Sequence, residues 1–579
     1  MNDQQFIFTP ENLSKYWKIL NNSNNPNERK IANSFLSEFK NKCPNNLEIS
    51  IELFSSESIE DKLISSILIY QYIKENPKKF LNNKELFNQI KEYLLNKILI
   101  PYSEIKDNEN NDNNEINNKK NLIIERICYT MSIIILLGCC SFWPDAIDYI
   151  INFGKKTLKH TYLMTIIIGN CKNELKDLLL SRKQDFIIKN KFIEKKDEFK
   201  DLINTIFINT NNIDKKLYKK TVDLAKNLTS FEVNILHIPN LIKIILNDIN
   251  INNIDSLSEL LSESIRCSNS RKLEVNSDLN INEYDEIINK DELISFSYII
   301  DIIISYVQNH NNPEEDIIFG FGKIFSGITE NFVFLFFKKD ILSQKIFNLF
   351  FFFISHKIRK ISQIFFETIS IIKNFISGNY KFSNYSQSEK IEFSNFLLKI
   401  LLNILNNCKF KTIKKKQDIL LNEEYISINN LYPNKNDEKN IKNNDENIDD
   451  INEVTIEDYR IAAEDVFSNI FLIFVENYGK EGINYFFDQI TKEIIPLLNK
   501  NINELNEEHI LSVEVILYAI NSIIDSFMNI DLDKTVLNKF TLLFLYSPIL
   551  SNNFILLNFL LLVQVESIYL DYNKDLFSE

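Results

Sequence analysis

Apolar residues recur at helical spacing through almost the whole chain, in segments separated by short breaks that contain Asn and Pro. Leu13 and Trp17 belong to the first such face, and Phe35 and Phe39 belong to the next, beyond the Asn-rich break at 21–27. This spacing places the apolar residues on one side of an α-helix, and the breaks have the composition of turns. The sequence therefore predicts a long series of amphipathic helices joined by short turns.

The same pattern continues almost to the end of the chain. Further periodic segments lie near residues 121–137, 142–153, 221–248, 254–266, 283–307, 314–336, 341–355, 357–377, 389–407, 455–477, 483–498, 508–527 and 533–546. Two helices and a turn occupy about 40 residues, the repeat length of HEAT and armadillo arrays. One pair cannot cover both of its apolar faces, so successive pairs must stack. We predict an all-α fold, an α-α superhelix or HEAT/armadillo-like solenoid of antiparallel helix pairs, with a set of separate helical bundles as the alternative.

Length and turn residues agree with an elongated helical protein. The chain has 579 residues, whereas single hydrophobic cores stop growing near ~250–300 residues. Its 9 glycines and 11 prolines are too few for the many tight turns of a large β or doubly wound protein. The remaining interpretation is a protein of long helices with short connections.

The charge balance is acidic, with 65 Lys and Arg against 79 Asp and Glu and a net charge of −14. Direct binding of nucleic acid is disfavoured, because nucleic-acid binders present a basic face. An acidic surface suits basic protein partners, although the same charge can simply keep a large protein in solution. The 7 cysteines are scattered without framework spacing, which is typical of a reducing compartment.

Two stretches rich in Asn, Asp, Glu and Lys interrupt the helical pattern. They contain few apolar residues and cannot bury enough surface to fold, so we expect disordered insertions. The insertions span residues 106–120 and 431–453, and the helical regions span 1–105, 121–430 and 454–579. No membrane insertion is expected, because the most apolar stretches of the chain are short or interrupted by polar residues.

The sequence contains no constellation typical of catalysis or metal binding. No histidine has a second His or Cys at i+3 or i+4, so we expect the five histidines at solvated or helix-terminal positions. Gly320, Gly322 and Gly327 lack the Gly-Lys-Ser/Thr ending of a phosphate loop and predict a closely packed helix instead. We predict a protein without enzymatic activity, cofactor or metal. The histidines are His160, His237, His310, His356 and His509.

Two further groups of residues have a structural interpretation. Acidic residues at 57–61 and 314–316 stand at predicted helix starts, where they favour the helix dipole. The Phe-rich stretch 332–353 could line an aromatic pocket. Consecutive aromatic residues point all around a helix, however, so we predict that most of them are core.

The N-terminal segment FTPENLSKYWKILNNSNNPNERKIANSFLSEFKNK resembles the opening of importin-β-type nuclear transport receptors. The likeness lies in a first helix with Trp17, a short break, and a second helix with Ala32, Leu36 and Phe39. The segment at 58–74 is similar to the apolar helix of the family's second repeat.

Later patches resemble the transportin-3/importin-13 branch of that superfamily. Residues 141–150 are similar to a Trp-containing helix that follows the third repeat of that branch. Tyr459, Arg460 and Asp465 match a mid-chain helix, and Glu514 keeps its place in the helix that follows, as does Ala519. The order and spacing of these patches agree with the family.

This resemblance implies a nuclear import receptor that binds cargo protein and Ran-GTP and carries the cargo through the nuclear pore past nucleoporins. In the family, Ran-GTP contacts the inner helices of the first repeats, here within residues 12–170. Basic or serine/arginine-rich cargo binds further along, and the receptor shuttles between cytoplasm and nucleus. Individual contact residues do not follow from the sequence. The alternatives are a HEAT-repeat scaffold without Ran dependence and an export receptor of the same superfamily.

The chain departs from the family in length and in its arginines. Members have about twenty repeats, and this sequence accounts for about a dozen. The Arg-rich helix with which this branch binds phosphorylated cargo has no counterpart, because the arginines are scattered. We expect either a sequence that lacks the family's C-terminal repeats or a shortened receptor with altered cargo.

Overall fold

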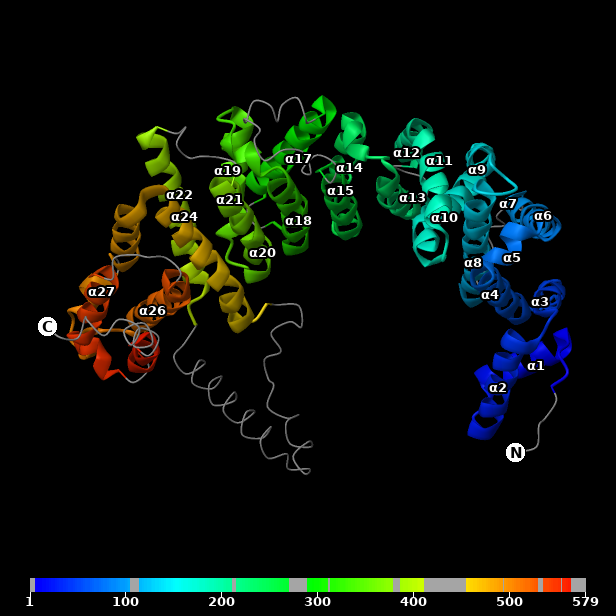
Figure 1. Ribbon diagram of the computed structural model, residues 1–579, viewed down its shortest axis with the longest axis horizontal. Helices are drawn as coiled ribbons and strands as arrows, with labels where there is room; N and C mark the ends of the chain where they lie inside the picture. The colour runs from blue at the N-terminus through cyan, green and yellow to red at the C-terminus, as the bar shows by residue number, and fades with distance from the viewer. Residues whose placement is uncertain are drawn as a thin grey trace. The chain divides into compact units, whose positions relative to one another are not determined.

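Helices are the only regular elements in the described part of the chain (Figure 1). The computed structural model describes residues 6–104, 114–210, 215–269, 289–310, 313–378, 386–410, 454–492, 494–528, 535–552 and 555–563. The chain divides into two compact units, the first made of Met1–Ile249 and Asp255–Ser268, the second of Asn250–Ile254 and Asn269–Glu579. The all-α prediction is confirmed.

The first unit, coloured from blue through cyan to green in Figure 1, consists of consecutive helices joined by short turns. Its helices are α1 (Pro10–Asn22), α2 (Pro26–Lys42), α3 (Asn46–Phe54), α4 (Ile59–Glu75), α5 (Pro77–Asn82), α6 (Lys84–Glu92), the π-helix η1 (Tyr93–Leu99), α7 (Ile100–Glu104), α8 (Asn114–Cys139), α9 (Ala146–Gly154), α10 (Leu158–Asp177), α11 (Arg182–Glu194), α12 (Lys196–Thr210), α13 (Lys215–Leu228), the short 3-10 turns η2 (Thr229–Phe231) and η3 (Ile235–His237), α14 (Pro239–Asn247) and α15 (Ile254–Asn269).

The polar breaks in the sequence become helix caps. The Thr9 hydroxyl accepts a hydrogen bond from the Asn12 backbone N–H at 3.3 Å, and Asn25 caps α2 in the same manner. Pro10 and Pro26 occupy the first helical positions, where a missing N–H costs nothing. The breaks therefore end one helix and start the next within three or four residues.

Helix pairs in the first unit stack so that the second helices of successive pairs lie side by side. Neighbouring pairs include α1 with α2, α3 with α4 and α9 with α10, while α4, α8, α10 and α13 form one continuous layer. Within this layer the Ser132 hydroxyl of α8 donates to the Ile167 carbonyl of α10 at 2.6 Å. Such stacking of antiparallel pairs is the architecture of a HEAT-like solenoid.

The second unit, coloured from green to red, repeats this arrangement. Its helices are α17 (Lys290–Asn309), α18 (Glu315–Asn331), the 3-10 helix η5 (Val333–Phe337), α19 (Ile341–Ile354), α20 (Arg359–Gln363), α21 (Phe366–Gly378), α22 (Gln387–Asn407), α24 (Ile456–Thr491), α25 (Ile495–Leu498), η7 (Ile502–Glu504), α26 (Glu507–Met528), α27 (Thr535–Leu545), η8 (Pro548–Ser551) and a helix over 555–563. Here α18, α21, α24 and α26 pack in sequence as one layer.

A glycine divides α24 into two helices. Gly479 has φ +56° and ψ −136°, which a residue with a side chain adopts only with strain. The break separates residues 456–478 from 480–491, so the two predicted segments at 455–477 and 483–498 are distinct helices. The prediction of two helices here is confirmed.

The predicted insertions need one correction. Residues 114–120 belong to α8 and are not a disordered insertion, because the Lys- and Glu-containing sequence continues the apolar helix and Lys119 pairs with Glu60 at 3.3 Å. Residues 106–113 and the second insertion, 431–453, lie outside the described residues, as does the stretch 411–430, for which the sequence predicts solenoid helices.

The Phe-rich stretch is mostly core, as predicted. Residues 332–337 are all buried, and so are Phe350 and Phe353. The first six of these residues form the end of α18 and the turn η5 instead of continuing the helix. Phe347 is half-buried.

Candidate functional site

The layer of α4, α8, α10 and α13 presents a polar face on the first unit. On the packed sides of these helices the residues are apolar or small, including Ile133, Ile167 and Gly169, all buried. On the remaining side, charged and tyrosine side chains connect each helix to others. We call these connected side chains the polar ladder.

Lys74 stands at the centre of the first part of the polar ladder. Its Nζ lies 2.7 Å from Asp177 and 3.1 Å from Glu174, both on α10, and donates to the Tyr70 hydroxyl at 2.8 Å. The Tyr70 hydroxyl in turn donates to Glu174 at 2.8 Å. The Arg126 guanidinium of α8 lies 5.0 Å from the Tyr70 ring centroid. These contacts connect three helices of the layer.

The protonation of this cluster follows from its neighbours. Burial alone would lower the pKa of Lys74, but hydrogen bonds to Asp177, Tyr70 and Glu174 outweigh it and raise that pKa. Burial raises the pKa of Tyr70. Lys74 is therefore an ammonium and Tyr70 a neutral phenol at physiological pH, and neither can serve as a general base there.

The polar ladder continues across α8, α10, α13 and α15. Glu125 of α8 accepts Lys220 of α13 at 3.1 Å and the Tyr162 hydroxyl of α10 at 3.4 Å. Two further pairs reach α15. They are Lys172–Glu263 at 3.5 Å and Lys226–Glu259.

This face is suited to binding another protein. Side chains of these three ion pairs are between 16% and 57% exposed, and solvated pairs contribute at most ~1 kcal/mol each. A charged partner can therefore replace one member of a pair at little cost, while the tyrosines offer apolar contact area.

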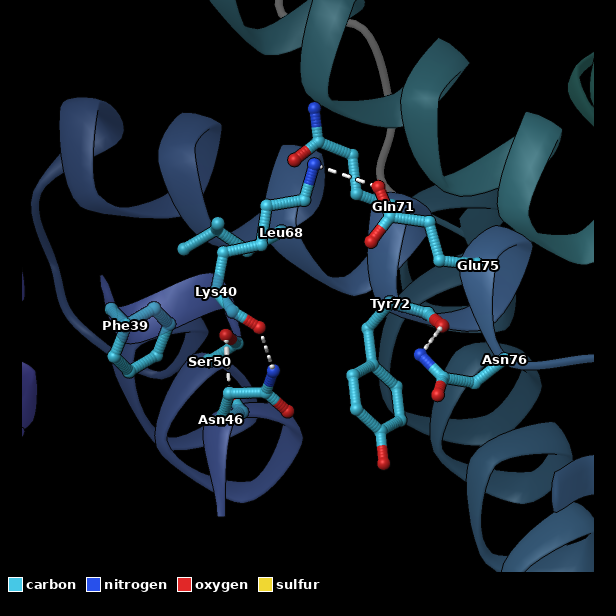
Figure 2. A pocket seen from close by; sticks show the side chains of 9 residues that line it. All are labelled: Phe39, Lys40, Asn46, Ser50, Leu68, Gln71, Tyr72, Glu75 and Asn76. Carbon is cyan, nitrogen blue, oxygen red and sulfur yellow. Dashed lines mark hydrogen bonds and ion pairs between the residues drawn. The ribbon is translucent and has the colours of Figure 1, made fainter. Parts of the chain in front are cut away.

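A small pocket lies beside this layer, between α2, α3 and α4 (Figure 2). Asn46 at the start of α3 donates to the Lys40 carbonyl at 3.2 Å, and the Lys40 side chain pairs with Glu75 at 2.7 Å. The Asn46 Oδ1 is buried and accepts no hydrogen bond from the described residues. The pocket volume is about 20 Å³, which is room for one water molecule that could donate to Oδ1. It is far smaller than a small-molecule site.

The second unit contains a buried ion pair between two of the family-like patches. Arg460 on α24 donates from both terminal nitrogens to Glu514 on α26, at 3.0 and 2.8 Å, and Arg460 is 5% and Glu514 0% exposed. Arg460 Nε donates to the Cys408 carbonyl at 2.7 Å. The guanidinium lies 4.0 Å from the Phe410 ring centroid and 4.8 Å from that of Tyr518.

The residues named in the sequence analysis differ in their burial. Tyr459 is buried with its hydroxyl 2.8 Å from the Ser362 hydroxyl, Ala519 is buried, and Asp465 is exposed. His160 is at a helix start as predicted but is buried, between the hydroxyls of Ser103 and Thr157. No sequence signal marked the polar ladder, because its members lie up to 104 residues apart.

The acidic residues at helix starts do more than favour the helix dipole. Asp61 in the first turn of α4 is buried and accepts hydrogen bonds from Ser14 at 2.6 Å and Ser56 at 2.9 Å. It thereby ties α4 to α1. Glu315 and Asp316 stand in the first turn of α18, as predicted.

Two general features bear on function. Within the described residues no group of three His, Cys, Asp or Glu side chains could hold a metal ion. The segment Ile116–Cys139 of α8 is long and apolar enough to cross a membrane, but 78% of its most apolar window is buried inside the protein. Its packing between α4 and α10 makes it a core helix of the first unit.

No protein-family model matches the chain, and no curated protein matches it. Among solved structures, importin-13 in its cytosolic state is 12% identical with a TM-score of 0.48, covering 79% of this chain and 48% of that one. Kap121p bound to Pho4p is 12% identical with a TM-score of 0.25, covering 89% and 53%. Yeast importin-beta, Kap95p, is 10% identical with a TM-score of 0.26, covering 94% and 76%.

The chain thus spans about half the length of importin-13 and Kap121p. The solenoid fold follows from the stacking of the helix pairs within each unit.

Proposed function

We propose that this chain is a nuclear transport receptor of the importin-β type, close to the transportin-3/importin-13 branch. It binds a basic or serine/arginine-rich cargo protein and Ran-GTP, contacts nucleoporins, and shuttles between cytoplasm and nucleus. Import is the proposed direction, in which Ran-GTP releases the cargo.

The pairing of Arg460 with Glu514 is the observation that carries this proposal. The sequence resemblance to the family includes both residues, each in a separate helix. Their bidentate, buried contact at 2.8 and 3.0 Å makes the two patches one structural unit. A buried ion pair is retained only when both partners are present, because either one alone leaves an uncompensated charge.

The polar ladder is the surface that we propose for binding Ran-GTP. It lies on the first unit, and its side chains on α4 and α8 fall within residues 12–170, where the resemblance expects Ran. Charges of both signs with tyrosines between them provide a specific and salt-sensitive protein interface. The net charge of −14 favours encounter with basic cargo.

The test is a binding assay with the full chain immobilised and Ran loaded with either GTP or GDP. We expect retention of Ran-GTP and not of Ran-GDP. Arg126→Glu places a negative charge beside Tyr70 on the polar ladder and should weaken that retention by about tenfold. Lys78→Glu is the matched control, because Lys78 is an exposed residue of α5, outside the layer.

Equal retention of the two nucleotide states would refute the receptor and leave a scaffold. Adding a cargo peptide to the same assay then distinguishes import from export. Ran-GTP that displaces a serine/arginine-rich probe peptide supports import, and Ran-GTP that strengthens its binding would overturn import in favour of export.

A further inference from the structure

A cavity with aliphatic walls lies in the second unit, among the end of α22, the short helix α25 and the first half of α26. Its volume is about 490 Å³, which is within the range of sites that bind small organic molecules. We call it the Lys409 cavity. Its aliphatic side chains, most of them buried, are Leu402, Leu405, Ile494, Leu497, Val515 and Ile516.

The polar residues that line the Lys409 cavity in the described part of the chain include cations and no carboxylate. Lys409 and His509 are both half-buried there, beside the exposed Asn406 and the half-buried Ser512. Two other cavities of this unit, of about 300 and 360 Å³, both have glutamates in their walls. In a chain of net charge −14, the Lys409 cavity is therefore a place where an anion meets positive potential.

The backbone holds Lys409 in place, and its ammonium group lacks a counter-ion. Lys409 follows Cys408, whose carbonyl accepts a hydrogen bond from Arg460 Nε at 2.7 Å and whose N–H donates to the Ile404 carbonyl at 2.9 Å. No carboxylate of the described residues forms an ion pair with Lys409. A half-buried ammonium group loses part of its hydration, so an anionic ligand would stabilise it.

His509 offers the cavity a second donor. Its Nδ1 accepts a hydrogen bond from the Asn506 N–H at 3.3 Å, so the neutral ring carries its proton on Nε2. Among the residues that the structure describes, this Nε2–H has no acceptor. The Ser512 hydroxyl already donates to the Glu508 carbonyl at 2.8 Å. The wall therefore offers an anion the ammonium group of Lys409 and one imidazole N–H.

We propose that the Lys409 cavity binds an aliphatic carboxylate of the medium-chain fatty-acid class. The hydrocarbon chain lies against the aliphatic walls, and the carboxylate pairs with Lys409, with His509 as the second donor. A peptide with acidic and aliphatic side chains is a poorer fit, because its backbone N–H and C=O groups need partners that aliphatic walls do not provide. The proposal does not rest on the transport function.

The test is isothermal titration calorimetry of the full chain with octanoate and, in parallel, with 1-octanol. We expect octanoate to bind, and Lys409→Gln to weaken its binding by about tenfold, because a charge-assisted hydrogen bond is lost. Octanol has the same chain length without the charge, so its affinity should change by less than about twofold. An unchanged octanol affinity also shows that the variant keeps the cavity.

Lys399→Gln is the matched control, because Lys399 is an exposed lysine of α22 that does not line the cavity. It changes the net charge equally and should leave the octanoate affinity within about twofold of that of the unmodified chain.

The length of the ligand tests the aliphatic walls. Lengthening the carboxylate from hexanoate to octanoate should tighten binding by roughly tenfold, since each methylene that leaves water contributes about threefold to fourfold.

Four results would overturn the proposal. They are no octanoate binding in the millimolar range, equal weakening by Lys409→Gln and Lys399→Gln, an equal loss of octanoate and octanol affinity in a Lys409→Gln chain with an unchanged melting temperature, and equal affinities for hexanoate and octanoate. Tighter binding of an acetylated, amidated peptide with one glutamate between two leucines would also overturn it, in favour of a peptide site.

Discussion

Replacing Glu514 by Gln should loosen the contact between α24 and α26 more than any exposed charge change. Gln keeps the volume of Glu514 and one hydrogen-bond acceptor but leaves the Arg460 guanidinium charged at 5% exposure. Both contacts between the two side chains are charge-assisted, at 3.0 and 2.8 Å. Removing one partner of a buried pair costs ~3–5 kcal/mol. The Cys408 carbonyl and two aromatic rings still face Arg460, so we expect the lower end, about 3 kcal/mol.

Native-state hydrogen exchange measured by mass spectrometry detects this change locally, without requiring the whole solenoid to unfold in one step. About 3 kcal/mol corresponds to roughly 10²-fold faster exchange of α24 and α26 amides. Asp301→Asn is the matched control, because the Lys345–Asp301 contact is shorter still, at 2.6 Å, but its side chains are 39% and 50% exposed. It should cost no more than ~1 kcal/mol.

A double variant tests the reasoning itself. Arg460→Met with Glu514→Leu removes both charges, so it should exchange more slowly than Glu514→Gln, since no buried charge remains unpaired. Unchanged exchange in Glu514→Gln, or faster exchange in the double variant than in the single one, would refute the buried-charge argument.

Three further perturbations test other parts of the structure. Gly320→Ala should lower the melting temperature, because its Cβ would overlap the Ile254 side chain and overpacking costs ~1–3 kcal/mol. Burial, helped by a neighbouring carboxylate, raises the pKa of Glu330 to about 7. The folded state therefore keeps a proton that the unfolded chain loses, so stability falls from about pH 4.5 to pH 7, and Glu330→Gln should flatten that fall in pH-dependent melting. Burial raises the pKa of both the Cys171 and the Cys267 thiols, but Cys171 is fully buried whereas Cys267 is partly exposed, so iodoacetamide should label Cys267 before Cys171, as peptide mass spectrometry would show.

The helices and their buried faces were predictable because apolar periodicity is a local signal. Leu13, Phe35 and Phe39 fall on one buried cluster of the first helices, as their spacing indicates. The Asn-Pro breaks coincide with helix caps for the same local reason. The prediction of a disordered insertion was wrong at 114–120. Lys and Glu have high helix propensity, so this polar segment extends the apolar helix that follows it.

The polar contacts were not predictable in the same way. A lysine on a helix reads as a solvated residue, and nothing near Lys74 in sequence indicates that Glu174 lies 3.1 Å away. The exception is Arg460 with Glu514, 54 residues apart, where resemblance to a family named both residues but not their contact. Pairing across layers depends on the stacking of the helices, which a single sequence does not encode locally.

The polar ladder and the apolar contacts beneath it differ in how they respond to a ligand. Apolar side chains between α8 and α10 fix the order of the helices, because separating them would expose buried surface at ~25 cal/mol per Å². Apart from the Lys74–Glu174 pair, whose carboxylate is buried, the ion pairs above them are partly exposed. Exposed pairs contribute at most ~1 kcal/mol each, so a ligand can re-pair them and shift the spacing of the helices slightly. Under the proposed function, Ran-GTP and cargo would favour different sets of pairs along one layer. Linkage then requires each ligand to weaken the binding of the other by the same factor.

A variant that uncouples the two ligands, such as Lys226→Glu at the contact between α13 and α15, should leave the affinity for each ligand alone nearly unchanged. It should reduce the displacement of cargo by Ran-GTP, as measured in a competition titration.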